Sequence, residues 1–399
     1  MLLRSAIIGW FAFAVALCLK VWIQGADHSV YGAFVIGPRH WWAGAAMYND
    51  RSYFYSPTFS VLFTPFALLP DWLGQTLWGL VSVGLFFWSL RAFYRHVMPN
   101  NWPRQAEGAF LWLVLAGALR GIWSLQSNAI LMAGVLFAAA AIVRYRWWRA
   151  AWFLAAPVYI KVWPLIAAGL LGIQWPRKLI GRVALAIVAF GFIPLLTKSP
   201  IDVTVYYRAW IERLTQRQEN VERFTGYRDA WTIWEQIRAP VDPHGYLLLQ
   251  AAGGMAVLAW CVWLKRSRNT SRSAAEIATY TLAIWACWQL LFGPGTERLT
   301  YMIVAPFAAW VVITSYFERK NFSLAIAAIV TTFILGSGKI ERVLAPAIPA
   351  AVALQPFGVI LFVVWLVRHA NIGRPWEARL QKSAPAQLVE PQTACSAAV

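Results

Sequence analysis

Long blocks of apolar residues alternate with short polar stretches along this chain. The blocks are apolar all round, not on a single stripe, and their lengths match the roughly 20 helical residues that cross a bilayer. This pattern predicts an all-α polytopic membrane protein. The expected spans are residues 2–24, 72–94, 108–123, 128–143, 150–174, 180–196, 246–264, 275–292, 299–317, 321–336 and 349–368.

The block at 150–174 is interrupted by Lys161-Val162-Trp163-Pro164. A single span would place Arg177, Lys178 and Arg182 on the opposite side from the other basic clusters. A hairpin of two short helices that turns at 161–164 restores the alternation. Broken helices are tolerated at membrane depth where they line a cavity enclosed by protein. We therefore predict a hairpin here and about 11–13 transmembrane helices in total.

Charged residues fix an orientation for these spans. Only 13% of the 399 residues are charged, and the net charge is +18. If both termini are cytoplasmic, that side holds 20 of the 35 basic residues and 5 of the 17 acidic ones. Such an asymmetry is the positive-inside pattern of membrane proteins. The basic residues lie in small groups between the apolar blocks and not in one cluster, which disfavours nucleic-acid binding. We expect a multi-pass protein of the bacterial plasma (inner) membrane with cytoplasmic N- and C-termini.

Two long segments, 25–71 and 197–245, are then extracytoplasmic. The apolar stretch 59–69 is short for a full crossing and is expected to be a helix at the membrane interface. Residues 206–236 are charged and aromatic, and we assign them to acceptor recognition on a helix. Residues 1–372 are expected to form one transmembrane domain, in which 2–24 is an uncleaved anchor, and the polar stretch 373–399 a disordered cytoplasmic tail.

No cofactor or metal site is expected. The five histidines are scattered, and the chain has no Asp-x-Asp pair. Of the four cysteines, three lie inside apolar blocks and one in the tail, so they give no disulfide framework.

Asp27 follows the first span and is the strongest candidate for chemistry. An ionisable side chain at the edge of the membrane is costly, which favours a functional role. The alternative is that its carboxylate caps the helix that begins at Ser29-Val30-Tyr31. Position alone leaves the two interpretations balanced.

A series of short motifs runs from residue 20 to about residue 310. They are Asp27-x-x-Val30-Tyr31, Gly44 with Tyr48, Tyr53-x-Tyr55-Ser56-Pro57, Pro65 with Leu68-Leu69-Pro70, Gln126-x-Asn128, Lys161-x-x-Pro164, and Gly293-Pro294-x-x-Glu297-Arg298-x-x-Tyr301. Their order and spacing resemble glycosyltransferase family 87, which contains polyprenyl-phosphate-mannose-dependent enzymes of the GT-C fold. Two departures are visible. Leu125 stands where the family often has glycine, and Glu297-Arg298 stand where some members have a histidine.

The resemblance implies a GT-C-like fold with a long first extracytoplasmic loop, and a catalytic base at Asp27. Such an enzyme would move a hexose, mannose most often in this family, from a polyprenyl-phosphate-linked donor to a glycolipid or glycan acceptor. Because phosphate is already a good leaving group, one carboxylate that deprotonates the acceptor would suffice, with inversion at the anomeric carbon. Cations would stabilise the departing phosphate.

Candidate partners of Asp27 come from the same motifs. Lys161 and Arg298 are candidates for binding the donor phosphate, and Arg120 is a weaker candidate. The alternative for Lys161 is that its side chain extends to the membrane interface. The alternative for Arg298 is an ion pair with Glu297, Asp202 or another outer carboxylate. Sugar or acceptor contacts are expected from His28, Tyr31, Gln126, Asn128 and Glu297. Gln126 and Asn128 could instead cap the span that follows, and His28 could be a surface residue.

Two other functions compete with the glycosyltransferase. A transporter or lipid-linked-sugar flippase also uses many spans and broken helices, but the sequence shows no pair of related halves. A noncatalytic envelope-assembly partner would keep the fold and lose the activity. The sequence does not specify the sugar, the acceptor, the linkage or the oligomeric state.

Overall fold

The protein is described by a computed structural model. It describes residues 1–25, 29–50, 52–98, 102–219, 226–237, 242–266, 272–293, 295–318, 320–336, 341 and 343–371. The tail 373–399 and residues Asp27 and His28 therefore lie outside the described part of the chain.

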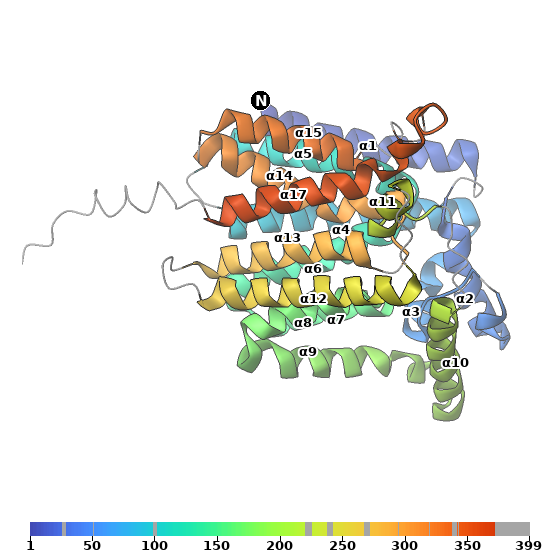
Figure 1. The fold of residues 1–399 in the computed structure, drawn as a ribbon. Coiled ribbons are helices and arrows are strands. Elements are labelled where there is room, and N and C mark those ends of the chain that lie inside the picture. Colours follow the sequence, from blue (N-terminus) through green and yellow to red (C-terminus); the bar gives the residue numbers. More distant parts are fainter. Residues whose placement is uncertain are drawn as a thin grey trace, which may run out of the picture.

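The described chain is a bundle of long helices with short helices gathered at one end (Figure 1). In the described part of the chain, the β pairing consists of an isolated antiparallel bridge between Tyr227 and Glu297. The helices of the bundle are α1 (Leu2–Gln24), α4 (Asp71–Val97), α5 (Arg104–Trp123), α6 (Asn128–Val143), α7 (Trp147–Ala155), α8 (Pro164–Gln174), α9 (Pro176–Gly191), α12 (Pro243–Arg266), α13 (Ala274–Phe292), α14 (Ala305–Ile313), α15 (Phe322–Gly336) and α17 (Leu354–Asn371).

Among the described residues, seven helices are long and apolar enough to cross a membrane. They are Leu2–Gln24, Asp71–Val97, Arg104–Trp123, Pro176–Leu196, His244–Arg266, Arg298–Phe317 and Pro349–Ala370. The shorter apolar helices Asn128–Val143 and Pro164–Gln174 add to them. The expected all-α polytopic class is confirmed, and most of the spans predicted from the sequence fall on these helices. The predicted spans 275–292 and 321–336 fall on α13 and α15, and the block at 150–174 is divided between α7 and α8.

The predicted hairpin is present between residues 147 and 174. Helix α7 ends at Ala155, the 3-10 turn η2 (Ala156–Tyr159) follows, and α8 starts at Pro164. Proline is well suited to the first helical turn because its missing N–H would have had no partner there. The chain therefore reverses at Lys161–Pro164, as the positions of the basic residues had indicated.

We call the two ends of the bundle outer and inner. The outer end carries α2 (Tyr31–Ala43), α3 (Pro57–Ala67), α10 (Pro200–Glu219) and α11 (Ala230–Gln236), and the described termini lie toward the inner end (Figure 1). Inner-end side chains connect neighbouring helix ends: Lys265 Nζ donates to Ile173 O (3.2 Å) and Arg272 to Ala370 O (3.2 Å). Basic residues of the clusters before and after these helices are thus found at the inner end.

The outer segments pack onto the bundle as short helices. Helix α3 starts at Pro57, where the Ser56 hydroxyl accepts the N–H of Phe59 and itself donates to Tyr159 O. Thr58 lies within hydrogen-bond distance of Tyr207 on α10 at 2.6 Å. The stretch 59–69 is thus largely helical, as predicted, and its residues Phe59, Ser60, Phe63 and Ala67 are buried. Its placement at a membrane interface stays a prediction.

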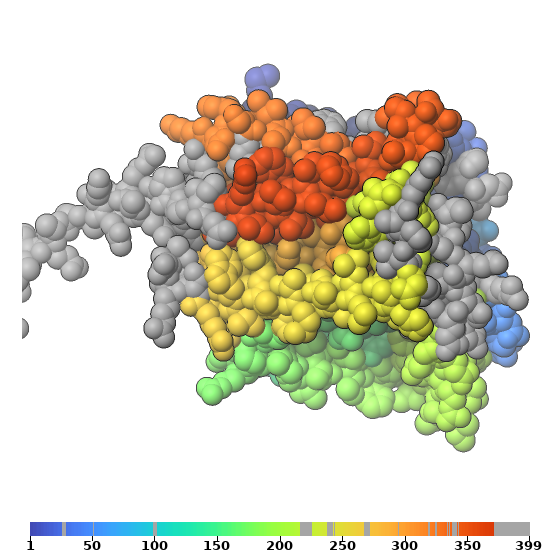
Figure 2. Space-filling model, in the orientation of Figure 1, coloured from blue at the N-terminus to red at the C-terminus, as the bar shows by residue number. Residues whose placement is uncertain are grey.

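Helices α17, α12 and α9 lie on the outside of the bundle, with α13 between α17 and α12 and α8 between α12 and α9 (Figures 1 and 2). Large apolar side chains are exposed along these helices, among them Leu185, Leu248, Met255 and Ile360. A soluble monomer rarely exposes so much contiguous apolar surface, whereas lipid chains would cover it at no cost. The face agrees with a bilayer-embedded bundle.

Candidate active site

The stretch that contains Asp27 and His28 lies outside the described residues, but its two flanks are fixed. On one side Gly25 closes α1 by donating its N–H to Val21 O (3.0 Å). On the other side Val30 donates its N–H to Ser124 O (3.2 Å), and the Ser29 hydroxyl donates to Gln75 Oε1 (2.9 Å). Both flanks are therefore at the outer ends of α1, α4 and α5.

The turn from α5 to α6 supplies the next group. Leu125 has φ of +57°, a left-handed conformation that glycine adopts far more readily than leucine. Its carbonyl accepts the indole N–H of Trp78 at 3.1 Å. The family's preference for glycine at this position has a direct explanation here. Gln126 follows in the buried part of the turn.

Asn128 opens α6 and is fully buried. Its Oδ1 accepts a hydrogen bond from Lys161 Nζ at 3.0 Å. The structure shows no side-chain cap at the start of α6, so Asn128 does not serve as the helix cap considered above. The hairpin turn and the start of α6 are thus joined by a lysine–amide pair.

Three buried polar atoms near this pair have no hydrogen-bond partner within the described structure. They are Asn128 Nδ2, Ser127 Oγ and Gln75 Nε2. A buried polar atom without a partner costs about 1–3 kcal/mol, and such atoms are rare in native proteins unless something else binds them. An outer-end polar interior of this kind suits a hydroxyl-rich ligand.

A second polar cluster contains a residue that the sequence had not singled out. Glu341 is only 1% exposed, and its Oε1 contacts two arginines: Arg228 Nε at 2.7 Å and Arg298 Nε at 3.0 Å. Of the alternatives considered for Arg298, the ion pair to another outer carboxylate is therefore present. The one sequence signal for Glu341 is that it is the lone acidic residue between the spans 321–336 and 349–368.

Glu297, the neighbour of Arg298, acts as a helix cap. Its side chain accepts the N–H of Thr300, and its own N–H donates to Thr300 Oγ1, so the two residues form a capping box at the start of the 3-10 helix η4 (Arg298–Val304). Its predicted contact with sugar or acceptor stays a prediction.

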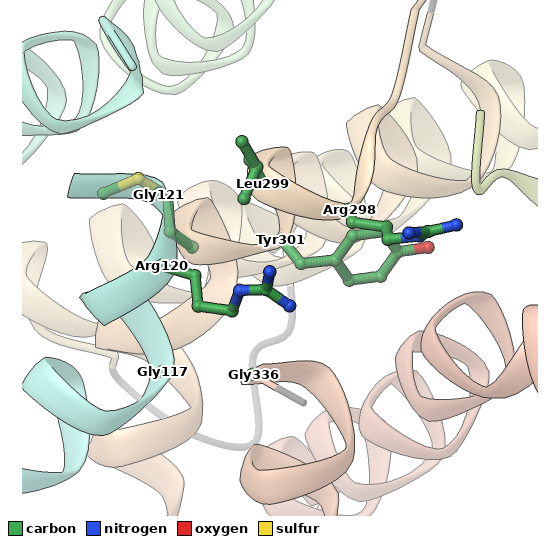
Figure 3. Close-up of a pocket in the computed structure, with 8 residues that line it drawn as sticks. Gly117, Arg120, Gly121, Arg298, Leu299, Tyr301 and Gly336 are labelled. Atoms are coloured by element: carbon green, nitrogen blue, oxygen red, sulfur yellow. The ribbon is translucent and has the colours of Figure 1, made fainter. Parts of the chain in front are cut away.

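A small cavity lies beside Arg298, between α5, η4 and α15. Its volume of about 10 Å³ is room for about one water molecule. Arg120 from α5 and Arg298 from η4 line it together with Tyr301 (Figure 3). Gly121 permits this close approach, because a Cβ there would lie 3.1 Å from Leu299 O and 2.4 Å from the Met302 sulfur. Two cations at one cavity favour an anion at its mouth, where Arg298 is 27% exposed.

Tyr31 takes no part in either cluster. It is 1% exposed, and its hydroxyl donates to Phe66 O at 2.8 Å. Burial, with a smaller contribution from the charge of Asp71, raises the pKa of Tyr31 to about 12, against an opposing effect of Arg39. The hydroxyl thus stays protonated and holds α2 against α3, and its predicted contact with the acceptor stays a prediction.

Together, the bundle of apolar helices and the two arginines at an outer-end cavity define a membrane protein with a cationic group at one end. The sequence model of glycosyltransferase family 87 matches residues 53–294, and the chain belongs to this family. It is a membrane-bound glycosyltransferase. The matched range includes Gln126, Asn128 and Lys161, but neither Asp27 nor Arg298.

Two further comparisons add little. The chain is similar to the crystal structure of ArnT from Cupriavidus metallidurans bound to undecaprenyl phosphate, at 18% sequence identity and a TM-score of 0.33, with 93% of this chain and 79% of that chain covered. That similarity is too low to transfer any ligand to this protein. The curated proteins contain no match to this chain.

Proposed function

We propose that this protein transfers a hexose, mannose most often in its family, from a polyprenyl-phosphate-linked donor to a glycolipid or glycan acceptor. The observation that carries the proposal is the pairing of family membership with two arginines, Arg120 and Arg298, at one outer-end cavity. A sugar linked to a lipid phosphate presents an anion next to a ring of hydroxyl groups. The arginines and the buried amides of Asn128 and Gln75 offer partners of both kinds.

Asp27 is the proposed general base. It removes the proton from an acceptor hydroxyl as that oxygen attacks the anomeric carbon of the donor. The bond from the anomeric carbon to the phosphate oxygen breaks, and its electron pair leaves with the polyprenyl phosphate. Attack from the side opposite the leaving group inverts the anomeric configuration, and no general acid is needed.

Arg298 is the proposed stabiliser of the departing phosphate, and Arg120 assists from the other wall of the cavity. Guanidinium groups match phosphate oxygens with two parallel N–H donors, and such charge-assisted bonds are strong. Lys161 supplies a further cation at the hairpin turn, next to Asn128. His28, Gln126 and Glu297 are proposed to contact the sugar or the acceptor.

The reaction is proposed to take place on the extracytoplasmic side. The inner end carries the basic clusters that the positive-inside rule assigns to the cytoplasm, so the outer end faces away from it. The lipid donor would enter from the bilayer, and the acceptor from the outer surface. A plasma-membrane location with both termini cytoplasmic follows from the same rule.

The decisive experiment measures transfer from a radiolabelled polyprenyl-phosphate sugar by purified protein. Asp27→Asn should lower kcat at least a hundredfold, since general base catalysis contributes about 10²–10⁴. Asp50→Asn is the matched control from the same outer segment. Hydrogen bonds from Ser52 hold the pKa of Asp50 below its usual range, so its carboxylate is ionised at neutral pH.

Equal activity of Asp27→Asn and the wild type would remove Asp27 from the catalytic role. If the wild type transfers sugar from no such donor but moves a solute or a lipid across vesicle membranes, the transporter or flippase is the better description.

A further inference from the structure

Glu341 is a buried carboxylate shared by two arginines from different outer segments. Arg298 belongs to η4, and Arg228 precedes α11, in the second outer segment. The carboxylate oxygen Oε1 accepts the Nε–H of Arg228 at 2.7 Å and forms an ion pair with Arg298, whose Nε lies 3.0 Å away. The other oxygen, Oε2, has no hydrogen-bond partner among the described residues. A buried charge of this kind is costly unless its partners are well placed.

We propose that Glu341 is a positioning residue that aims the guanidinium of Arg298 at the donor phosphate; the proposal rests on the proposed function. The ion pair, with Arg298 Nε 3.0 Å from Glu341 Oε1, ties the exposed end of Arg298 to a buried and immobile anion. Arg298 is 27% exposed and lines the cavity, so an anchored guanidinium there can meet a phosphate that approaches from the outer surface.

Arg228 makes the carboxylate rigid. Its backbone N–H donates to Thr296 O at 2.7 Å, and its carbonyl accepts the hydroxyl of Tyr301 at 2.7 Å. Its Nη1 also donates to Tyr227 O at 2.7 Å. With Arg228 held at both backbone and side chain, Glu341 is held as well, and through it Arg298.

Two opposing effects follow from removal of the Glu341 charge. The first is electrostatic: without a carboxylate beside Arg298, the positive potential at the cavity increases, which favours a phosphate. The second is conformational: two guanidiniums at one site repel each other, and the flexible Arg298 side chain turns to solvent. Because a released arginine side chain gains much conformational freedom, we expect the second effect to win and phosphate binding to weaken.

The test measures the affinity of the detergent-free protein in nanodiscs for undecaprenyl phosphate, with undecaprenol as the phosphate-free comparison. Glu341→Gln should weaken binding of undecaprenyl phosphate about tenfold and leave undecaprenol unchanged, because the lost contact is to the phosphate. Arg298→Gln should weaken it by at least as much. If Glu341 acts through Arg298, the double variant should be no weaker than Arg298→Gln alone.

Glu107→Gln is the matched control. Glu107 is also a buried carboxylate between two arginines, but at the inner end, with Arg91 Nε at 2.9 Å and Arg95 Nε at 3.7 Å. It should lower thermal stability and leave the affinity for undecaprenyl phosphate unchanged. Glu341→Asp, which keeps the charge, should recover part of the lost affinity and serves also if Glu341→Gln does not fold.

The proposal is wrong if Glu341→Gln binds undecaprenyl phosphate as tightly as the wild type, or more tightly, or if the effects of Glu341→Gln and Arg298→Gln add in full. Equal losses for undecaprenyl phosphate and undecaprenol would also overturn it, since they would indicate a purely structural role. Failure of the proposed function gives a different result, in which the wild type itself shows no preference for the phosphate-bearing lipid; the positioning role of Glu341 then falls with it.

Discussion

The outer and inner ends of the bundle contain the same arrangement, a buried glutamate between two arginines. At the inner end Glu107 connects the end of α4 to the start of α5, and the closer arginine, Arg91, is 16 residues away in sequence. At the outer end Glu341 connects segments that are remote from each other, and Arg228 is 113 residues away.

The two clusters also differ in burial and geometry. Arg95 is 54% exposed and 3.7 Å from Glu107, whereas both arginines of Glu341 lie within 3.0 Å of the same oxygen. The inner cluster joins two consecutive helices, and one of its arginines reaches solvent. The outer cluster holds three segments around a cavity. An ion pair between neighbouring helices, as at Glu107, is enough to hold two consecutive helices together. A binding site built from remote segments needs contacts such as those of Glu341, which fix these segments against each other.

The largest effect expected from this comparison is on stability. Glu341→Gln leaves the 6%-exposed Arg228 without its carboxylate, and breaking a buried ion pair in this way costs about 3–5 kcal/mol. Glu107→Gln should cost only about 1 kcal/mol, because Arg95 already reaches solvent. Thermal unfolding of the purified variants should therefore show a much lower apparent Tm for Glu341→Gln. Equal decreases in apparent Tm would mean that the two clusters contribute equally to stability.

Two lysines sharpen the comparison between site and scaffold. Lys161 donates to Asn128 Oδ1, whereas Lys20 on α1 donates to Trp123 O at 2.8 Å and lies over the Trp123 ring. Both are partly buried cations. Lys161→Met should lower kcat/KM for the lipid-linked donor about a hundredfold, the scale expected for removal of a preorganised electrostatic contact.

Lys20→Met is the matched control and should keep kcat/KM within about threefold of the wild type, since its partner is a backbone carbonyl that no substrate needs. A hundredfold loss in both variants would assign Lys161 to structure. No loss in either would remove Lys161 from the donor site.

Much of the fold could be predicted from the sequence because membrane spans are long, apolar and local. The α7–α8 hairpin was visible from Lys161, Pro164 and the side on which Arg177 had to lie. The partners within the site could not be predicted in the same way. Asn128 and Lys161 were each identified as candidates, but no spacing rule pairs residues on different helices, so their hydrogen bond emerged only from the structure.

Glu341 was missed for a related reason. A lone glutamate in a short outer connection looks like an ordinary solvated residue. Its importance depends on the segment before α11, which brings Arg228 to it through the bond between Arg228 N and Thr296 O. Contacts of that range carry no local sequence pattern. For Asp27, position alone left a functional role and a helix cap balanced, and the resemblance then favoured a catalytic base.

The smallest expected effect concerns two left-handed residues, one at each end. Leu125 in the outer turn and Tyr145 at the inner end both have φ of +57°. Such a conformation costs about 1–2 kcal/mol for a residue other than glycine. Leu125 is 1% exposed, however, while Tyr145 is 72% exposed. The strain is therefore the same at both positions, but only Leu125 recovers it through packing.

Glycine substitution separates the backbone strain from the packing of the side chain at each position. Tyr145→Gly should change stability by less than about 1 kcal/mol, because the relief of strain offsets the greater chain entropy of glycine in the unfolded state. Leu125→Gly should destabilise by about 1–3 kcal/mol, since loss of a buried leucine costs about 2–5 kcal/mol against the same relief. Thermal unfolding of both variants measures the difference. If Leu125→Gly were the more stable of the two, the side chain of Leu125 would contribute no packing, and the departure from the family's glycine would have no structural compensation.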